Sequence, residues 1–581
     1  MEIGYSIEKT VQIIVSLLKA HDIKKIVVSP GSTNICLVAS LQSDPFFEMY
    51  SCVDERSAAY IACGIAAESN ETVVLTCTEA TASRNYLSGL TEAYYRKLPI
   101  LAITATNRRT LVGQNHPQMI DRSIIPKDVA KYSLYLPYIY EEREAIENAN
   151  LVNCAILELN HNDGGPVHIE YETHYSQDYS VKELPEYQIT RRFTVEDTLP
   201  KITNGNIAII IGAHKVWSNE LQCAVESFCE ANNAVVLADH ISNYKGKYRI
   251  NPTIVTSQTQ YKPPCCEIDL AIYIGNISSS YRKNYHIKKV WRVNPDGMIR
   301  NVFGNTSAVF EMSEYLFFQH YSKCDHKQNM SYYESWNSEY NKMVSMIPNL
   351  PFSNLWIAQH AGNLLPANSN LFLGIENSLR AWNFFDIPDS VHTFCNTGGF
   401  GIDGGVSSLV GASLIHPEKL YFGITGDLAF FYDMNVLGNR HVGNNIRLIV
   451  INNGIGQQFK NPGHPAQILA EKSDEFVAAR GHFGNKSNKL LKHYAEDLGF
   501  DYLSASSKEE FLAVLNRFLI SKVTGKSIIF EVFTDTENET SALKMMYSLQ
   551  TDVHSVAKDA MKKVLGDKGI KVVKGILGKK Q

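Results

Sequence analysis

Short runs of apolar residues alternate along the chain with segments whose apolar residues recur every three or four positions. The first such segment predicts a helix over Ser6–Ala20 with Ser6 as its N-cap, followed by a strand at Ile26–Val28. The same alternation predicts further strands at Val73–Thr76, Ile100–Thr104, Val167–Tyr171, Ile207–Ile211, Ala234–Leu237, Leu270–Ile274, Trp291–Val293, Leu371–Gly374, Leu420–Thr425, Arg447–Ile451 and Ser527–Val532. Continuous apolar strands between helices are typical of parallel sheets that are covered on both faces. The pattern therefore predicts an α/β protein built from doubly wound parallel sheets.

Two polar breaks that contain proline divide this pattern into three parts of similar size. The breaks lie at Glu183–Glu186 and Ile347–Pro351. They predict three domains and a basic C-terminal tail, with the ranges 1–183, 190–346, 353–560 and 561–581. The tail mixes lysines with Ile, Val and Leu, which favours a solvated helix or a frayed end over a contact with an anionic membrane.

Composition narrows the class of protein. The chain has 581 residues, of which 44% are hydrophobic and 20% charged, as in a folded globular protein. The 55 Lys and Arg residues against 60 Asp and Glu residues provide no general attraction to nucleic acid. The eleven cysteines form neither a C-x-x-C pair nor a closely spaced framework, which favours free thiols. Because the sequence shows neither a signal peptide nor a transmembrane segment, we expect a cytoplasmic protein.

Polar residues follow two predicted strands of the third domain. The strand Leu420–Thr425 runs into Gly426-Asp427, and the strand Arg447–Ile451 runs into Asn452-Asn453-Gly454. Because parallel strands end at the same edge of a sheet, the carboxylate and the amide can face one point. Such oxygens suit Mg²⁺, and a helix start after the Gly-Asp pair offers N–H groups to a diphosphate. These residues alone leave a plain turn as the alternative.

Glu55 lies at the start of a predicted helix of small residues in the first domain. Taken alone, this position indicates only an acidic residue that stabilises a helix N-terminus. The chain as a whole, however, resembles the MenD-type thiamine-diphosphate-dependent enzymes, the 2-succinyl-5-enolpyruvyl-6-hydroxy-3-cyclohexene-1-carboxylate synthase family. The motifs occur in the family's order along nearly the whole chain. They are Ser29-Pro30-Gly31-Ser32, Asp54-Glu55-Arg56-Ser57-Ala58-Ala59, Asn85-Tyr86, Gly165-Pro166-Val167-His168-Ile169, Gly401-Ile402-Asp403-Gly404, and Gly426-Asp427 with Asn453.

The resemblance implies a pyrimidine-binding, a central and a diphosphate-binding domain, in a homodimer or homotetramer with active sites between subunits. It implies thiamine diphosphate and Mg²⁺ as cofactors, and decarboxylation of a 2-oxo acid with transfer of the acyl-anion equivalent to an acceptor. Glu55 would then bond the aminopyrimidine ring, and Gln118 would lie near the reacting centre. The other implied cofactor contacts are Ser32, Ser378, Ile402, Gly426, Asp427, Leu428 and Asn453. The implied metal ligands are Asp427, Asn453 and the backbone carbonyl of Ile455.

The family binds substrate carboxylates with arginines, and several of these arginines are replaced here. The replaced positions carry Thr33, Asn107, Thr397 and Trp382, with Arg380 close by and Arg282 in the central domain. Phe459 matches a family residue on the acceptor side. His116 and His464 are candidates for an acid or base group or for ordinary surface histidines. Glu79 replaces a small turn and is either a polar group at the pocket edge or a surface residue.

We therefore predict a carboligase that takes a small 2-oxo acid and a polar acceptor less anionic than isochorismate. One alternative is the menaquinone-pathway synthase itself, acting on 2-oxoglutarate and isochorismate, with Arg282 and Arg380 compensating for the lost arginines. The other alternative is an inert cofactor-binding regulatory subunit. The joint presence of Glu55, Asp427 and Asn453 argues against an inert subunit.

Overall fold

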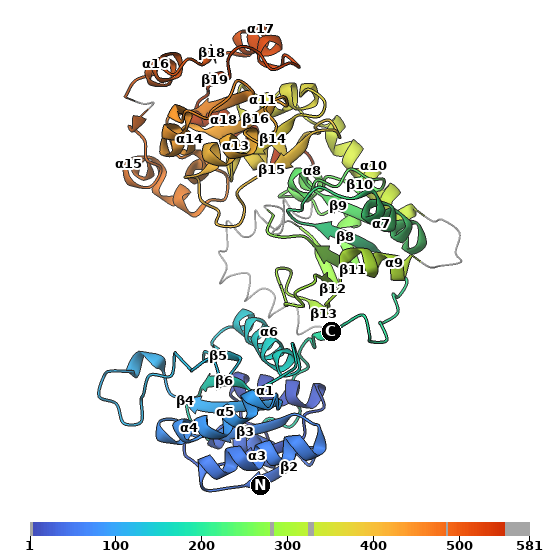
Figure 1. Cartoon of the computed structure of the whole chain (residues 1–581), viewed down its shortest axis with the longest axis vertical. Helices are drawn as coiled ribbons and strands as arrows, with labels where there is room; N and C mark the ends of the chain where they lie inside the picture. Colours follow the sequence, from blue (N-terminus) through green and yellow to red (C-terminus); the bar gives the residue numbers. More distant parts are fainter. Residues whose placement is uncertain (1–3, 279–283, 323–329, 484–485, 552–581) are drawn as a thin grey trace, which may run out of the picture. The chain divides into compact units, whose positions relative to one another are not determined.

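The structure is a computed structural model that describes residues 4–278, 284–322, 330–483 and 486–551. The chain divides into two compact units (Figure 1). The first unit comprises Met1–Leu199 and Asp296–Glu311, and the second comprises Pro200–Pro295 and Met312–Gln581.

The first unit contains a six-stranded parallel sheet with the order β2-β1-β3-β4-β6-β5. Its strands are β1 (Lys25–Val28), β2 (Glu48–Ser51), β3 (Val73–Cys77), β4 (Ile100–Thr106), β5 (Tyr132–Leu136) and β6 (Val167–Glu172). Its helices are α1 (Lys9–Ala20), α2 (Ile35–Gln42), α3 (Glu55–Ser69), α4 (Thr81–Asn85), α5 (Leu87–Tyr95) and α6 (Glu142–Glu158). A short parallel pair, β7 (Arg191–Phe193) with β13 (Thr306–Phe310), also belongs to this unit.

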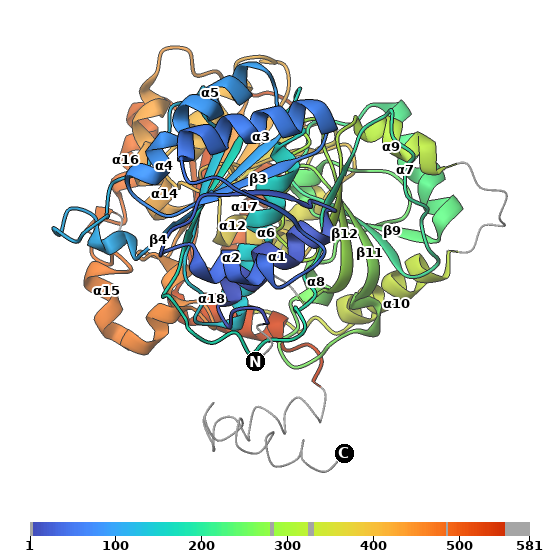
Figure 2. The ribbon, with the colours of Figure 1, turned by 90° about the horizontal axis from the view of Figure 1, so that it is seen from below.

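Alternation of side chains along the strands explains why both faces of this sheet are covered. Ile26 and Val28 belong to an apolar cluster that includes residues of α1, α2 and α6. Val27, between them, points to the opposite face and belongs to a second cluster with α3 and α5. Figure 2 shows these two groups of helices on the two sides of the sheet. Burial on both faces therefore requires the continuous apolar strands seen in the sequence.

The second unit contains two further sets of parallel strands. The first has the order β10-β9-β8-β11-β12. Its strands are β8 (Ile207–Ile211), β9 (Ala234–Ala238), β10 (Arg249–Ile250), β11 (Glu267–Ile274) and β12 (His286–Val293). Helices α7 (Asn219–Asn232), α8 (Thr253–Thr256), α9 (Glu314–Tyr321) and α10 (Ser331–Ser345) accompany them.

The last sheet is six-stranded and parallel, with the order β15-β14-β16-β17-β19-β18. Its strands are β14 (Asn370–Leu373), β15 (His392–Phe394), β16 (Tyr421–Gly426), β17 (Ile446–Asn452), β18 (Asp501–Ala505) and β19 (Ile528–Phe533). Its helices are α11 (Asn354–Ala361), α12 (Asn377–Trp382), α13 (Gly405–Ser413), α14 (Asp427–Asp433), α15 (Ser473–Phe476), α16 (Leu490–Asp497), α17 (Lys508–Phe518) and α18 (Thr536–Tyr547). The crossover connections leave the carboxyl ends of β14, β16 and β17 side by side.

The predicted α/β class and its parallel sheets are confirmed, and every predicted strand is present. The prediction of Ser6 as N-cap is wrong, because α1 begins at Lys9 with Glu8 before it. Ser6 instead accepts a hydrogen bond from the backbone N–H of Glu8 and donates its own backbone N–H to Ser40. The domain boundaries remain predictions, and the basic tail lies outside the described residues.

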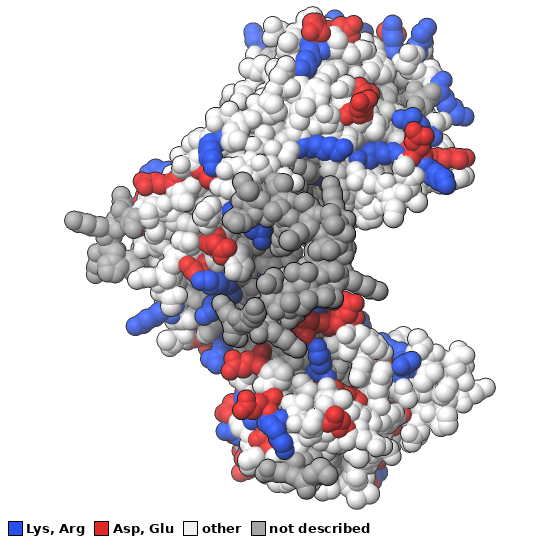
Figure 3. All heavy atoms as spheres, turned by 180° about the vertical axis from the view of Figure 1, so that it is seen from behind, with Lys and Arg blue, Asp and Glu red and all other residues white. Residues whose placement is uncertain are grey.

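The surface and the thiols agree with the composition. On the face shown in Figure 3, basic and acidic side chains are intermixed on each unit. The ten cysteines in the described part of the chain are all free. Within the same residues, no helix has the length and apolar character needed to cross a membrane.

Candidate functional site

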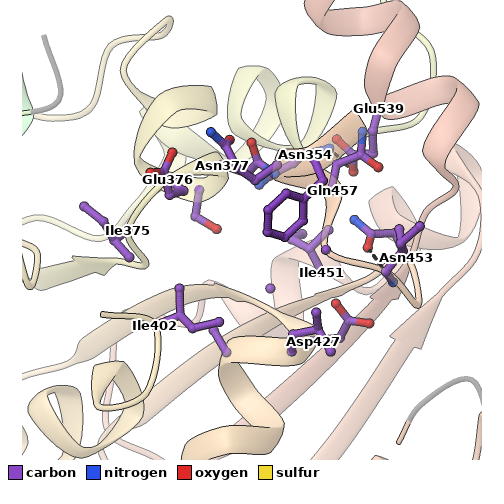
Figure 4. Close-up of a pocket in the computed structure, with 18 of the residues that line it drawn as sticks. Asn354, Ile375, Glu376, Asn377, Ile402, Asp427, Ile451, Asn453, Gln457 and Glu539 are labelled. Carbon is purple, nitrogen blue, oxygen red and sulfur yellow. Dashed lines mark hydrogen bonds between the residues drawn. The ribbon is translucent and has the colours of Figure 1, made fainter. Parts of the chain in front are cut away.

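A cavity of about 400 Å³ lies at the carboxyl edge of the last sheet (Figure 4). Loops that follow β14, β16 and β17 form much of its wall, with contributions from α11, η6 (Gln457–Lys460) and α18. Nine residues predicted from the sequence line it together. They are Ser378, Ile402, Gly426, Asp427, Leu428, Asn453, Ile455, Phe459 and His464.

The register of two neighbouring strands brings Asp427 and Asn453 to this edge. Gly426 on β16 is paired with Ile451 on β17, so each polar residue follows directly where its strand ends. One Asp427 carboxylate oxygen accepts a hydrogen bond of 2.9 Å from the backbone N–H of Gly454. The Asn453 amide oxygen accepts one of 3.3 Å from the backbone N–H of Ile455. These contacts hold the loop after β17 against the start of α14.

The chemistry of this edge fits a bound cation. Asp427 is only 4% exposed, and burial raises the pKa of its carboxyl to about 7. No Lys or Arg is among the cavity-lining residues of the described chain, so no side-chain cation there offsets this buried acid. A divalent ion would supply that charge, with a carboxylate, an amide oxygen and a backbone carbonyl as hard ligands. The described residues contain no group of three or more His, Cys, Asp or Glu side chains suited to a metal, so amide and carbonyl oxygens are needed.

Arg380 lies behind the cavity wall formed by α12. Its guanidinium donates to Asn377 at 2.6 Å, to Gln458 at 2.7 Å and to the Glu376 carboxylate at 2.9 Å. All three partners line the cavity. The charge of Arg380 is therefore largely balanced by Glu376 before any substrate arrives.

Phe459 and His464 form one aromatic corner of the cavity. Their rings lie 5.3 Å apart at an interplanar angle of 88°. The Nδ1 atom of His464 accepts a hydrogen bond of 3.1 Å from the backbone N–H of Ala466. This bond leaves Nε2 as the nitrogen that carries the proton in the neutral ring.

Sequence reasoning missed three buried polar residues of the cavity, namely Asn354, Gln457 and Glu539. They come from α11, η6 and α18, which are far apart in the sequence. Asn354 and Glu539 belong to no recognisable motif. Gln457 could have been predicted from the sequence, because it follows the strand-end motif Asn452-Asn453-Gly454 by a few residues.

In the first unit, Glu55 is the first residue of α3 and is half-buried. Asp54 is the N-cap, and its side chain accepts a hydrogen bond of 3.0 Å from the backbone N–H of Ser57. Glu55 accepts a hydrogen bond of 3.2 Å from the side chain of Asn85. Because Asp54 caps the helix, the carboxyl of Glu55 is free for another role.

A buried carboxyl connects two other predicted residues of the first unit. Glu79 is 4% exposed and accepts a hydrogen bond of 3.2 Å from the backbone N–H of Asn107. Its own backbone N–H donates to the Thr33 hydroxyl at 3.2 Å, and that hydroxyl also contacts Thr78. The interpretation of Glu79 as a surface residue is therefore wrong, and burial raises the pKa of its carboxyl.

The other predicted residues of the first unit are exposed. Ser32 follows the turn after β1, while His116 and Gln118 belong to a segment between η1 (Arg109–Leu111) and β5 without helix or strand. Gln118 has a φ of 65°, in the left-handed region. Arg282 lies outside the described residues.

The model for the thiamine pyrophosphate enzyme N-terminal TPP-binding domain matches residues 8–125. The chain is 30% identical over 568 residues to the 2-succinyl-5-enolpyruvyl-6-hydroxy-3-cyclohexene-1-carboxylate synthase of Bacteroides fragilis, covering 94% of this chain and 99% of that protein. The synthase of Phocaeicola vulgatus is also 30% identical, with coverage of 94% and 98%. The synthase of Flavobacterium johnsoniae is 27% identical, with coverage of 92% and 98%.

A solved structure, the Rhodococcus jostii RHA1 thiamine diphosphate-dependent 4-hydroxybenzoylformate decarboxylase, matches with 14% identity and a TM-score of 0.38. The match covers 90% of this chain and 99% of that one, but a score this low supports no argument. The family assignment depends on the sequence matches, which span almost the whole of both chains. The chain is a thiamine-diphosphate-dependent 2-oxo-acid decarboxylase and transferase, and it belongs to the 2-succinyl-5-enolpyruvyl-6-hydroxy-3-cyclohexene-1-carboxylate synthase family.

Proposed function

We propose that the protein is itself a 2-succinyl-5-enolpyruvyl-6-hydroxy-3-cyclohexene-1-carboxylate synthase, which joins the decarboxylated remainder of 2-oxoglutarate to isochorismate. The observation that carries this proposal is the 30% identity to synthases of this name over 94% of the chain. The sequence left this function open as the first alternative to a carboligase with a less anionic acceptor. The preference for a less anionic acceptor was predicted from the replaced arginines, and no comparison with known proteins supports it.

We propose that Asp427, Asn453 and the backbone carbonyl of Ile455 hold Mg²⁺, and that the metal binds the diphosphate of the cofactor. Ser378 and the backbone at Gly426 and Leu428 would offer donors to the same group. Ile402 would provide an apolar support, because it lies across the cavity floor from the polar edge (Figure 4). Bound thiamine diphosphate supplies the electron sink for decarboxylation.

The chain's own task is to orient the reactants and move protons. Glu55 would share a proton with a pyrimidine nitrogen, which changes the proton affinity of the amino group on that ring. Gln118 would lie near the reacting carbon, while His116 and His464 are the candidate acid or base groups. Phe459 and His464 would form an aromatic wall toward the acceptor.

A second candidate is a carboligase with a less anionic acceptor, and specific observations favour it. Glu376 balances the charge of Arg380, and no Lys or Arg is among the described residues that line the cavity. The Thr33 hydroxyl, at another replaced arginine position, is occupied by Thr78 and the Glu79 backbone. Losing an arginine–carboxylate contact in a buried site costs about 2–5 kcal/mol.

A decarboxylation screen decides between these functions. The purified protein with thiamine diphosphate and Mg²⁺ is mixed with pyruvate, 2-oxoglutarate or larger 2-oxo acids, each with and without isochorismate. We expect carbon dioxide release from 2-oxoglutarate and a ligated isochorismate product. Release only from another 2-oxo acid, without that product, would establish the second candidate. Bound cofactor without any release would support an inert regulatory subunit.

We also propose a homo-oligomer in which the pyrimidine-binding residues of one subunit serve the diphosphate-binding residues of another. Glu55 belongs to the first compact unit and Asp427 to the second. The test mixes the inactive variants Glu55→Gln and Asp427→Asn and lets them dissociate and reassemble. If two subunits share each active site, the mixture should regain about a quarter to a half of the wild-type activity. No recovery in assemblies shown to contain both variants would contradict the proposal. A cytoplasmic location stays a prediction.

A further inference from the structure

The wall of the cavity across from Asp427 carries a second buried carboxyl, that of Glu539. Figure 4 shows Glu539, Gln457 and Asn354 gathered on this wall. The three side chains are 8%, 6% and 4% exposed. The strand-end motifs of the sequence do not include Glu539, and the reaction outlined above does not use it.

Among the residues that the structure describes, hydrogen-bond donors contact only one oxygen of this carboxyl. Glu539 Oε1 accepts a hydrogen bond of 2.8 Å from the Thr534 hydroxyl and another of 3.0 Å from the backbone N–H of Asn354. These two donors fix the plane of the group and tie α18 to the first turn of α11. Oε2 is therefore the oxygen that remains for a ligand.

The charge of the cavity determines which form of Glu539 is compatible with an anion. Three carboxyl side chains line it, those of Glu376, Asp427 and Glu539, and the described lining residues contribute no Lys or Arg. Glu376 is paired with Arg380, and Asp427 suits the metal. An ionised Glu539 would face the diphosphate as an unpaired like charge in a buried site, which is unfavourable.

The neighbouring amide of Gln457 already uses one of its two N–H donors within the protein. Gln457 Nε2 donates to the Thr540 hydroxyl at 3.1 Å, and Gln457 Oε1 is a buried acceptor without a partner in the described part of the chain. A diphosphate oxygen is likewise an acceptor. An ionised Glu539 carboxylate can only accept hydrogen bonds and would repel the diphosphate. With a proton on Oε2, the same carboxyl donates a hydrogen bond.

We propose that Glu539 is a cofactor-positioning residue whose protonated carboxyl donates a hydrogen bond from Oε2 to the diphosphate tail, so that this cavity binds the cofactor tightly only while Glu539 keeps its proton. This inference rests on the thiamine-diphosphate site of the proposed function. Deprotonation therefore weakens cofactor binding even when Asp427, Asn453 and the metal are unchanged.

The surroundings of Glu539 favour the protonated form near neutral pH. The pKa of its carboxyl is raised to about 7, because the effect of burial exceeds the lowering by the hydrogen bonds from Thr534 and Asn354, and the nearby charge of Asp535 adds a smaller increase. Helix α18 packs against α11 and η6. The titratable groups there are His360 on α11 and Lys460 on η6.

Neither His360 nor Lys460 neutralises the charge of Glu539. His360 Nδ1 donates to the Trp356 carbonyl of its own helix at 2.8 Å. Lys460 is paired with Asp474. Glu531, on the strand before α18, is bonded to Asn452 and Tyr502.

The test is the pH dependence of cofactor affinity. We would measure the Kd of thiamine diphosphate with saturating Mg²⁺ by calorimetry at pH 6.5 and pH 8.5 for the full-length protein. The wild type should bind about tenfold or more weakly at the higher pH, since each pH unit above the pKa removes about nine-tenths of the protonated form. Glu539→Gln carries a permanent donor of the same shape and should change by less than about twofold.

Matched variants keep the test specific. Glu537→Gln removes an exposed acid from the same helix and should follow the wild type. Glu539→Asp retains a titrating carboxyl on a shorter chain and should bind more weakly but keep the pH dependence. If Glu539→Gln loses affinity with pH as steeply as the wild type, the inference is wrong. If no variant binds the cofactor at either pH, the proposed cofactor site itself is wrong, and the inference falls with it.

Discussion

At the scale of single residues, the environment decides what each acid in this protein can do. Asp54 and Glu55 are neighbours, yet Asp54 caps α3 while Glu55 contacts Asn85. Asp427 and Glu539 both line one cavity, but the first lies at a strand end suited to a metal and the second is tied to α11. Residue identity alone does not separate these roles.

Replacing Glu55 with Gln should lower turnover by about 10²–10⁴-fold, because the amide cannot share a proton with the pyrimidine ring. Binding of thiamine diphosphate, measured separately by calorimetry, should change far less. Asp54→Asn is the matched control, since an asparagine also caps a helix. Near-normal turnover of Glu55→Gln with cofactor bound would exclude the proposed role.

The buried carboxyl of Glu539 also predicts a stability that depends on pH. Its folded-state pKa of about 7 is above the ordinary value of 4.5, so the unfolded chain ionises first as pH rises. The folded state thus loses up to about 3 kcal/mol between these two values, and the loss is complete above pH 7. Glu539→Gln should remove this part of the pH dependence in unfolding experiments on the cofactor-free protein at pH 5 and pH 8. An unchanged difference between the two pH values would show that the side chain ionises freely in the folded state.

At the scale of elements, the apolar pattern of the sequence indicates central strands more clearly than edge strands. The central strands β3, β4 and β16 are almost wholly buried and were recognised from their continuous apolar runs. The strands β2 and β18 lie at sheet edges, contain exposed and half-buried positions and were not predicted. An edge strand covers less apolar surface, so its sequence carries a weaker signal.

A buried ion pair joins the segment that carries Gln118 to the first sheet. The Arg122 guanidinium lies 2.8 Å from the Glu170 carboxylate on β6 and donates to the Ala105 carbonyl on β4 at 2.9 Å. Both charged residues are buried, with exposures of 6% and 3%. Arg122→Met should therefore destabilise the protein by about 3–5 kcal/mol, because it leaves the Glu170 charge buried with one partner fewer.

Arg143→Met is the control for this change. Arg143 is exposed and pairs with Glu147 one helical turn away, a contact worth about 0.3–0.5 kcal/mol. Chemical unfolding followed by fluorescence would compare the two variants. Equal, small losses of stability would mean that Arg109, which also contacts Glu170, is sufficient to balance the Glu170 charge.

At the scale of the whole molecule, side chains distant in the sequence connect the sheets of the second unit. The Asn243 amide donates to the Thr393 carbonyl at 2.9 Å and to the His214 carbonyl at 3.0 Å, and its oxygen accepts from the Thr393 backbone at 2.8 Å. These bonds join the turn after β9 to β15. The second unit is therefore held together by directional contacts as well as by apolar packing.

Asn243→Ala should weaken this connection by about 2–4 kcal/mol, from three lost hydrogen bonds and a φ of 53° that alanine adopts poorly. We expect calorimetry to show a lower and broader melting transition for the variant. Asn70→Ala, at the end of α3 with a φ of 56°, is the control for backbone strain. Identical transitions in the two variants would show that the bridge to β15 contributes little.

The sequence was sufficient for the α/β class, the buried strands and the strand-end residues Asp427 and Asn453, because hydrophobic periodicity and motif order are local properties. It could not reveal that Glu79 is buried, or that Arg380 is already paired with Glu376. Nor could it bring Asn354, Gln457 and Glu539 to one wall of the cavity. Those features arise only when α11, η6 and α18 pack together, since burial and electrostatic environment depend on neighbours that the linear order does not specify.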